Sequence, residues 1–312
     1  MKKIIVKKIL DLLDKKGFVR KPIGEDPKIK LYEEMNEVFL PKNEGIISVI
    51  FSKDRAMQLD GFLASYFENV KNYSEIIVLY YVSTDQHKES YDDLKEIYAN
   101  FPVKFIAETD FRENLIEALE NSVEDRVIFY VDDMLFSQKM DYKWLIEVNP
   151  LQDIVSLSRG KDLNYSTVLA KKLDIPSFKK FTTNLFRFQW NEIKEFSDWT
   201  YPIGVSGYMF SRPEILAMMK VTYFKAPNSL EHNLQQFLPY FINRGGICLE
   251  YVATPCVHTN LTQTEGYNNV LGHYSLEELL ILWNDNKRID YKEFIGLKVS
   301  DAEVKKYNFT ER

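Results

Sequence analysis

Apolar and polar positions follow one another in blocks that predict buried strands separated by amphipathic helices. The clearest block is residues 127–131, an unbroken apolar run that ends on two adjacent carboxylates, Asp132 and Asp133. A run of this length predicts a strand covered on both faces of a sheet. Three similar runs precede it, at residues 46–51, 75–82 and 103–107. Helical spacing of apolar residues fills the intervals, so we predict an α/β fold with a mostly parallel central sheet and helices on both faces.

Each strand predicted in this half of the chain is followed by an acidic residue. These residues are Asp54, Asp85, Asp110 and the pair Asp132 and Asp133. Because the carboxyl ends of parallel strands meet at one edge of an open sheet, where ligands bind, we expect these carboxylates to lie close together. Two adjacent carboxylates can hold a divalent cation against phosphate oxygens. The alternative for the pair is an ordinary Asp-rich turn, but the convergence of the other strand ends favours a site for a metal and a nucleotide.

The loop after the first predicted strand carries four polar residues, Ser52, Lys53, Asp54 and Arg55. Its carboxylate suits a ribose or a base edge, and Arg55 suits a phosphate. The loop lacks the glycines of a Rossmann fingerprint or a P-loop, so it supports neither a dinucleotide site nor a phosphate-cradling ATP site. The alternative interpretation is structural: Asp54 would cap the following helix, and Arg55 would be a surface residue.

The second half of the chain offers fewer signals. Gly204 and Gly207 interrupt a β-like run just before Tyr208, and a backbone with such glycines can approach a ligand closely. Glu231 lies near the start of a predicted helix for which Ser229 is the expected N-cap. Glu231 could act as a general base, or it could only be a favourable charge at the helix N-terminus.

A late strand is predicted at residues 246–253, and His258 follows it. A histidine after a strand end can bind a metal, although a single histidine is more often structural. Aromatic residues gather between residues 178 and 199, where they could stack on a sugar but suit an ordinary core better. Beyond Tyr274 we predict a polar helical tail.

Composition and charge narrow the function classes. The net charge of −6 argues against a nucleic-acid partner, because phosphate backbones are bound mainly by an excess of Lys and Arg. Cys248 and Cys256 lack metal-ligand spacing, so we expect reduced thiols in a cytoplasmic protein. No apolar run reaches the roughly 18 residues that span a bilayer, and we expect no secretory signal.

Residues 1–17 combine a basic surface with an apolar stripe formed by Ile5, Ile9, Leu12 and Leu13. Such a helix can lie on an anionic membrane, which would make the protein peripheral at the inner face of the membrane. It can equally dock on its own domain or on another subunit.

With these motifs, the chain resembles nucleotide-sugar-dependent glycosyltransferases of the GT-A fold over roughly residues 45–260. In that family an acidic motif after the fourth strand holds the metal and the ribose, and here it corresponds to Val131, Asp132 and Asp133. The run VDDMLF is similar to the Glu-Asp-Asp-Leu form of N-acetylglucosaminyltransferases. Val131 stands where an acidic residue is usual, which puts a ribose contact from that position in doubt. The resemblance implies that Asp133 is a direct metal ligand and that Asp132 contacts the ribose or a bridging water.

The resemblance also implies roles for the other candidate residues. The nucleotide sugar would contact Ser52, Lys53, Asp54, Arg55 and Asp85. The acceptor side would be shaped by Gly204, Gly207 and Tyr208. Glu231 would be the catalytic base of an inverting reaction, and in a retaining reaction it need not be a base at all. His258 would complete the site of a Mn²⁺ or Mg²⁺ ion.

The function implied is transfer of a sugar from a nucleotide diphosphate sugar, with a UDP-sugar favoured, to a hydroxyl of a glycan or lipid-linked acceptor. We expect such an enzyme in bacterial surface-polysaccharide synthesis. The catalytic domain would span residues 45–262, between an N-terminal helix with its connecting segment (1–44) and a C-terminal helical tail (263–312). The alternatives are a sugar-phosphate nucleotidyltransferase, whose Gly-rich, Arg-bearing first loop is not matched here, and a non-catalytic module that binds a nucleotide or a glycan.

Overall fold

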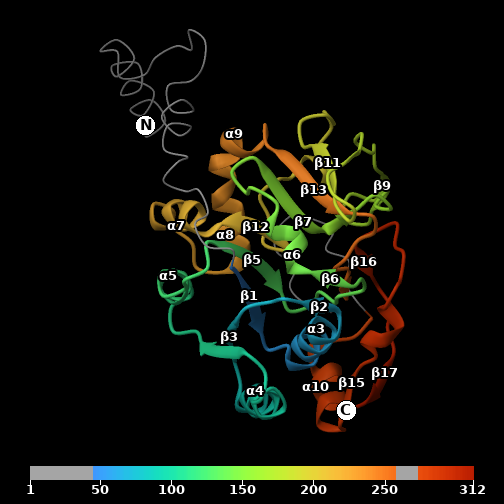
Figure 1. The fold of residues 1–312 in the computed structure, drawn as a ribbon. Helices are drawn as coiled ribbons and strands as arrows, with labels where there is room; N and C mark the ends of the chain where they lie inside the picture. Colours follow the sequence, from blue (N-terminus) through green and yellow to red (C-terminus); the bar gives the residue numbers. More distant parts are fainter. Residues whose placement is uncertain (1–44, 258–272) are drawn as a thin grey trace, which may run out of the picture. The chain divides into compact units, whose positions relative to one another are not determined.

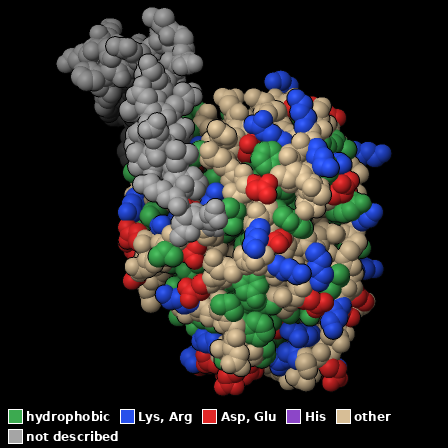
Figure 2. Space-filling view, viewed as in Figure 1, with side chains coloured by type: hydrophobic (Ala, Val, Ile, Leu, Met, Phe, Trp, Pro, Cys, Tyr) green, Lys and Arg blue, Asp and Glu red, His purple; other side chains and the backbone are tan. Residues whose placement is uncertain are grey.

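The computed structural model describes residues 45–257 and 273–312. A nine-stranded sheet organises them, with the strand order β10-β11-β13-β7-β12-β5-β1-β3-β4. Figure 1 labels seven strands of this sheet, from β11 to β3. On the face shown in Figure 2, Lys and Arg side chains are interspersed with Asp and Glu over the described surface. The basic segment at residues 1–17 lies outside the described residues. Within them, no helix is long and apolar enough to cross a membrane.

One half of the sheet is purely parallel. Its strands are β1 (Ile46–Lys53), β3 (Ile76–Tyr81), β4 (Val103–Ala107) and β5 (Arg126–Val131). β1 lies between β3 and β5, and β4 pairs with β3 at the edge. The apolar runs in the sequence predict all four strands to within two residues at either end, and the structure confirms them.

The other half of the sheet is mixed. Its strands are β7 (Asp153–Gly160), β12 (Tyr208–Ser211), β13 (Gly245–Leu249), β11 (Phe186–Gln189) and β10 (Lys179–Lys180). β12 runs antiparallel between β5 and β7, and β13 is parallel to β7. β11 and β10 then add antiparallel strands at the edge. Because β7 and β13 run in the direction of the first four strands, the sheet is mostly parallel, as predicted.

Helices cover both faces of the sheet. The first face carries α3 (Ala56–Asn69) and α4 (Asp85–Ile97), and the second carries α5 (Phe111–Glu120) and α7 (Arg212–Lys220). Adjacent side chains of a strand point to opposite faces. In β1, Ser48 accordingly lies 3.2 Å from the Tyr66 hydroxyl of α3, whereas the Phe51 ring lies 5.2 Å from the Phe111 ring of α5. The predicted two-sided architecture is confirmed.

Shorter elements complete the first part of the chain. They are α6 (Tyr142–Ile146), α8 (Pro227–Leu234), α9 (Leu238–Phe241), and the paired strands β2 (Val70–Lys71) with β6 (Met140–Asp141) and β8 (Tyr165–Ser166) with β9 (Lys171–Lys172). In the aromatic stretch, Phe188, Trp190 and Trp199 are buried, which confirms a core role for these three. Cys248 and Cys256 are buried and free.

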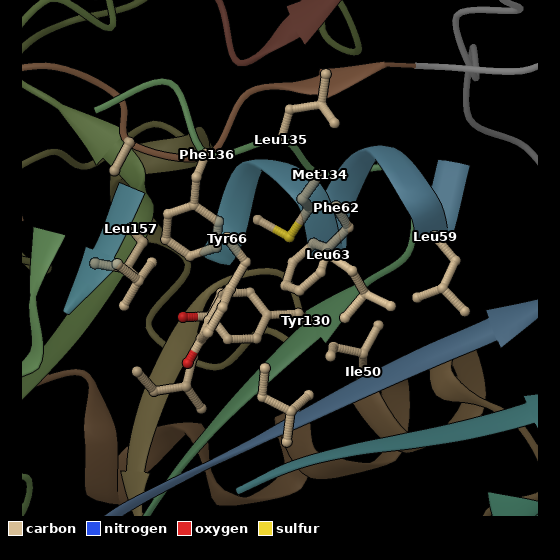
Figure 3. Packing of buried hydrophobic residues seen from close by; sticks show 14 of the residues in the cluster. Ile50, Leu59, Phe62, Leu63, Tyr66, Tyr130, Met134, Leu135, Phe136 and Leu157 are labelled. Atoms are coloured by element: carbon tan, nitrogen blue, oxygen red, sulfur yellow. The ribbon is translucent and has the colours of Figure 1, made fainter. Parts of the chain in front are cut away.

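The segment that follows the carboxylate pair is anchored in the core. Met134, Leu135 and Phe136 are fully buried, and Figure 3 shows Met134 beside Phe62 and Phe136 beside Tyr66 of α3. The Phe136 ring lies 5.7 Å from the Phe62 ring and 5.2 Å from the Tyr66 ring. Burying a large apolar side chain stabilises a fold by about 1.5–3 kcal/mol. The backbone that carries the two carboxylates is therefore held in place from its C-terminal side.

The C-terminal segment differs from the prediction. Its one described α-helix is α10 (Leu276–Asn284), and it also contains the short strands β15 (Lys287–Ile289), β16 (Glu303–Val304) and β17 (Phe309–Glu311). β15 pairs with β17 and contacts α3, where the Arg288 guanidinium donates hydrogen bonds of 2.9 and 2.7 Å to the Asp60 carboxylate. β16 pairs in parallel with β14 (Cys256–Val257). A wholly helical tail was the wrong prediction, because strands of two or three residues leave no periodicity in the sequence.

Candidate active site

The carboxylate pair lies at the carboxyl end of β5, and both carboxylates bind one arginine. Nη1 of Arg55 donates hydrogen bonds to Oδ1 of Asp132 (3.0 Å) and to Oδ2 of Asp133 (2.9 Å). The exposed fractions of these three side chains are only 18%, 4% and 10%. The parallel register that pairs Phe51 with Val131 brings the two following loops side by side. The structure therefore joins three of the candidate residues, as the strand order predicts.

The first loop also holds Asp132 from its other side. Oδ2 of Asp132 accepts hydrogen bonds from the Ser52 hydroxyl (2.8 Å) and from the backbone N–H of Lys53 (3.3 Å). Ser52 is bonded in turn to the Tyr91 hydroxyl of α4. Burial raises the pKa of Asp132 to about 6, and the charge of Arg55 opposes that rise. These contacts fix both oxygens of the Asp132 carboxylate.

Asp54 holds the neighbouring strand end. Its φ of 55° lies in the left-handed region, and its carboxylate accepts hydrogen bonds from the backbone N–H (2.7 Å) and hydroxyl (2.8 Å) of Ser83. The N-cap position of α3 belongs to Arg55, which makes no side-chain cap hydrogen bond. The structural interpretation, with Asp54 as the cap and Arg55 on the surface, is therefore wrong. A ribose or base contact of Asp54 stays a prediction.

Two other strand-end aspartates begin helices. α4 starts at Asp85, and Thr84 caps it by accepting a hydrogen bond from the His87 N–H (3.3 Å). Asp85 is exposed in the first turn, where its charge favours the helix dipole. Asp110 caps α5 by accepting a hydrogen bond from the Glu113 N–H (2.9 Å). Among the described residues, neither aspartate is hydrogen-bonded to the carboxylate pair, and a contact of Asp85 with the nucleotide sugar stays a prediction.

Lys53 is the last residue of β1, at the carboxyl end of the parallel strands. Its side chain is exposed, and its ammonium group lies 5.3 Å from the centre of the Tyr81 ring, which is 42% exposed. The charge of Lys53 also opposes the rise that burial causes in the pKa of Glu108. A cation and an aromatic face thus border the loop that carries Arg55.

Glu231 belongs to a second polar cluster, on α8. Burial raises the pKa of Glu231 to about 7, and the hydrogen bond with Tyr201 and the charge of Arg159 oppose the rise. α8 begins at Pro227, two residues before the predicted cap Ser229, so Glu231 lies in the second turn of the helix. The interpretation of Glu231 as a charge at the helix N-terminus is therefore wrong. A carboxyl group that is half protonated near neutral pH suits a general base.

Arg159 lies at the centre of the second cluster, at the end of β7. It is 7% exposed, its Nε donates to the Asp198 carbonyl oxygen (3.0 Å), and its Nη1 donates to the Ser158 carbonyl oxygen (3.2 Å). Its guanidinium carbon lies 5.8 Å from the centre of the Tyr208 ring. The charges of Asp198 and Glu231 stabilise its protonated form. Sequence reasoning assigned no role to Arg159, although the short, mostly apolar stretch at residues 154–157 just before it was an available signal.

The predicted acceptor-side residues pack around one aromatic ring. A Cβ at Gly204 would lie 2.6 Å from the Tyr208 ring, so only glycine allows this close approach. Gly207 has a φ of +78°, and a Cβ there would lie 3.1 Å from Cε of Met134. Tyr208 is buried, and its hydroxyl donates to the Tyr201 carbonyl oxygen (3.0 Å). These residues shape the wall beside Arg159, and direct contact with an acceptor stays a prediction.

A carboxylate of the C-terminal segment lies between the two clusters. Glu303 pairs in register with Cys256, which bridges Met134, the residue after the carboxylate pair. Burial raises the pKa of Glu303 to about 8, the charge of Asp133 adds to the rise, and the charge of Arg159 opposes it. The charged groups thus form one continuous series from Asp133 to Arg159. Sequence reasoning missed Glu303, because nothing in a polar tail distinguishes one carboxylate from its neighbours.

The carboxylate pair fits a divalent cation. A cationic nitrogen of Arg55 already lies within 3.0 Å of one oxygen from each carboxylate, so the pair shares one position for positive charge. Carboxylate oxygens are the donors that Mg²⁺ and Mn²⁺ prefer, and Mg²⁺ commonly uses only one or two protein carboxylates. In residues 45–257 and 273–312, no group of three His, Cys, Asp or Glu side chains could hold a metal ion. His258, the other predicted ligand, lies outside the described residues.

The fold and the site together define an α/β protein whose charged groups gather at the carboxyl edge of its parallel strands. No family model matches the chain. Over 214 residues the chain is 28% identical to a bifunctional glycosyltransferase of Dictyostelium discoideum, and the match covers 61% of this chain and 27% of that protein. The chain thus spans about a quarter of the length of the curated relative it matches. This similarity confirms the resemblance to glycosyltransferases that the motifs indicate.

Solved structures with a similar fold are more distant. A mannosyltransferase from Pyrobaculum calidifontis, solved with GDP-Man and Mn²⁺, is 14% identical, with 75% of this chain and 65% of that chain covered and a TM-score of 0.40. A nucleotidyl transferase from Methanothermobacter thermautotroptrophicus is 9% identical, with 66% and 88% covered and a TM-score of 0.38. Likenesses at this distance concern the fold alone and do not separate the two enzyme classes.

Proposed function

We propose that this chain is a glycosyltransferase that moves a sugar from a nucleotide diphosphate sugar, with a UDP-sugar favoured, to a hydroxyl of a glycan or lipid-linked acceptor. The observation that carries the proposal is the presence of two charged clusters along one sheet edge. The carboxylate pair with Arg55 suits a diphosphate leaving group, and Glu231, with its pKa raised to about 7, suits an acceptor hydroxyl. The similarity to the Dictyostelium glycosyltransferase supports the same assignment.

On the donor side, the loop after β1 binds the nucleotide sugar. Arg55 and Lys53 pair with phosphate oxygens, because a guanidinium and an ammonium group bind phosphate through charge-assisted hydrogen bonds. Asp132, oriented by Ser52, contacts the ribose. Asp133 and His258 are our candidates for holding Mn²⁺ or Mg²⁺, which supplies charge that stabilises the departing nucleoside diphosphate.

On the acceptor side, Glu231 acts as the general base of an inverting reaction. It takes the proton from the acceptor hydroxyl while that oxygen forms its bond to the anomeric carbon and the bond to the nucleoside diphosphate breaks. With a pKa of about 7, Glu231 is a stronger base than an ordinary carboxylate and is still ionised in a large fraction of molecules at neutral pH. Tyr201 and Arg159 orient it, and Tyr208 packs behind them.

The cellular setting is a further part of the proposal. We place the enzyme in the cytoplasm, at the inner face of a bacterial membrane, in surface-polysaccharide synthesis. The basic amphipathic pattern of residues 1–17 supports membrane contact, because such a helix binds anionic lipid surfaces. We assign residues 45–262 to the catalytic domain, to which the segment 263–312 adds Glu303.

The test is release of nucleotide from a panel of UDP-, GDP-, CMP- and dTDP-sugars in the presence of Mn²⁺. We expect one nucleotide class to turn over, and we expect Asp133→Asn to lower the rate at least about 100-fold, as loss of electrostatic stabilisation of a leaving group does in other enzymes. Asp110→Asn is the matched control. It changes another strand-end aspartate, and asparagine still caps α5.

Other outcomes would point to the other two classes. Pyrophosphate formation from a nucleoside triphosphate and a sugar 1-phosphate would identify a nucleotidyltransferase. Tight donor binding without turnover, over a broad set of acceptors, would identify a binding module.

A further inference from the structure

Arg55 occupies the position where positive charge is shared by the carboxylate pair. The same atom, Nη1, donates to Asp132 at 3.0 Å and to Asp133 at 2.9 Å. The hydrogen bonds described for this guanidinium therefore use one nitrogen as a compact charge, whereas a strongly held arginine forms a two-nitrogen fork with one carboxylate. Because both bonds use Nη1, the other N–H donors of the guanidinium can bind another anion.

The carboxylates do not depend on Arg55 alone for their positions. Oδ2 of Asp132 is bound by the Ser52 hydroxyl and by the Lys53 backbone N–H, neither of which involves Arg55. The backbone of Asp133 is held through its carbonyl oxygen, which accepts a hydrogen bond from the Val257 N–H (2.6 Å). If the guanidinium left, the two carboxylates would stay close together as an uncompensated pair of negative charges.

Two cations cannot share this position at low cost. Like charges a few ångström apart repel strongly in a partly buried site, where water screens them poorly. A divalent cation that binds the pair must therefore displace the guanidinium of Arg55. The backbone of Arg55 need not move with it, because its N–H is bound to the Tyr91 hydroxyl (3.2 Å) at the start of α3.

We propose that Arg55 is an exchangeable counter-ion: it neutralises Asp132 and Asp133 before a divalent cation binds, and after the exchange its guanidinium pairs with the donor diphosphate. The second half of this inference rests on the proposed glycosyltransferase function, and the first half does not. Arg55 thus positions the two carboxylates before the cation binds, and it binds the diphosphate once the cation and the donor are present.

The experiment measures Mn²⁺ affinity without any nucleotide, by calorimetry or by the electron paramagnetic resonance signal of free Mn²⁺. It compares the wild type with Arg55→Met and Arg55→Gln at one fixed, mildly alkaline pH. We expect both variants to bind Mn²⁺ about tenfold more tightly than the wild type, because a competing unit charge beside the site is removed. We expect UDP affinity at saturating Mn²⁺ to fall about tenfold, because a charge-assisted contact to the diphosphate is lost.

Two controls keep the result specific. Arg187→Met removes another arginine paired with an aspartate, Asp153, on the far half of the sheet, and it should leave Mn²⁺ affinity unchanged. Arg55→Lys keeps the positive charge and should not show the tenfold gain. Circular dichroism checks that each variant is folded, and Arg55→Gln, which retains a hydrogen-bond donor, serves if Arg55→Met is not.

Equal or weaker Mn²⁺ binding in the Arg55 variants would overturn the exchange, and so would Mn²⁺ binding too weak to detect in every protein. The outcome is separable from the proposed function. If Mn²⁺ affinity rises but no nucleotide sugar is bound or turned over, the exchange stands and the glycosyltransferase function fails. If a donor turns over but Mn²⁺ affinity does not rise, the function stands and the exchange fails.

Discussion

The two charged clusters are built in different ways. The first cluster comes from adjacent parallel strands, since Ser52 ends β1, Arg55 follows it and the carboxylate pair follows β5. The second cluster joins Arg159 at the end of β7 with Glu231 from α8, and Glu303 reaches it from the C-terminal segment. The first cluster follows from the strand order, whereas the second depends on packing between distant segments. If the clusters serve donor and acceptor separately, their variants should fail in different assays.

The largest difference between the effects on turnover and on donor binding is expected for a substitution of Glu231. Glu231→Gln keeps the shape of the side chain but cannot take a proton, so we expect the turnover number for transfer to fall about 10²- to 10⁴-fold. Donor affinity, measured by calorimetry, should change by less than about twofold. That is smaller than the several-fold loss of affinity expected when a hydrogen bond to the donor is removed. A comparable loss of donor binding would mean that the two clusters act as one.

The pH dependence should distinguish the clusters next. Because Glu231 must be ionised to act as a base and its pKa is about 7, turnover at saturating donor and acceptor should rise about tenfold per pH unit below 7 and level off above it. The rise should be absent in Glu231→Gln. A profile with its inflection at an ordinary carboxyl pKa would contradict the role of Glu231. The ionisation of Asp132, whose pKa is raised to about 6, should instead affect the affinity for the donor.

The burial of Glu303 between the two clusters should make the stability of the fold depend on pH. The pKa of Glu303 is raised from 4.5 to about 8, so the folded protein holds a proton that the unfolded chain releases, and stability is lost as pH rises from 4.5 through 8. Glu303→Gln should therefore raise the unfolding midpoint at pH 8 by about 2–4 °C, the shift expected for roughly 1 kcal/mol in a domain of this size, and less at pH 5. Glu117→Gln, on the exposed side of α5, is the control and should show no such pH-dependent gain. If the wild type and Glu303→Gln unfold at the same midpoint at both pH values, Glu303 is exposed to solvent.

The smallest effect is expected from Ser52, at the carboxyl end of β1. Ser52→Ala removes the 2.8 Å hydrogen bond to Asp132, and a hydrogen bond of this kind contributes about 0.5–1.5 kcal/mol, so nucleotide affinity should fall about 2- to 12-fold. The KM for the acceptor should be unchanged. An acceptor KM that rises as much as the donor KM would argue against separate sites.

The limits of sequence reasoning follow the same division. Long apolar runs reveal parallel strands, and parallel pairing forces their carboxyl ends together, so the meeting of Arg55 with Asp132 and Asp133 was predictable. The same logic does not assign a role to Asp85 and Asp110, because an aspartate before a helix also serves the helix start, and periodicity does not tell which use a strand-end aspartate has.

The second cluster shows the opposite case. Glu231 was expected in the first turn of a helix capped by Ser229, but the N-cap is Ala226, three residues earlier, and a proline takes the first helical position. Glu303 was not noticed at all, since its place depends on a two-residue strand pairing with Cys256 across a separation that no local pattern encodes. Short-range patterns predict elements, and only the assembled chain shows which loops meet.

The pairing of β14 with β16 affects how variation in this chain would be interpreted. In a survey of random substitutions, positions near residue 303 would look like a dispensable end by distance along the chain, far from Asp133. The structure places them next to the carboxylate pair instead, since Cys256 connects Glu303 to the segment after the carboxylates. Substitutions at residues 303 and 304 would therefore disturb the carboxylate pair without changing any of the recognisable motifs.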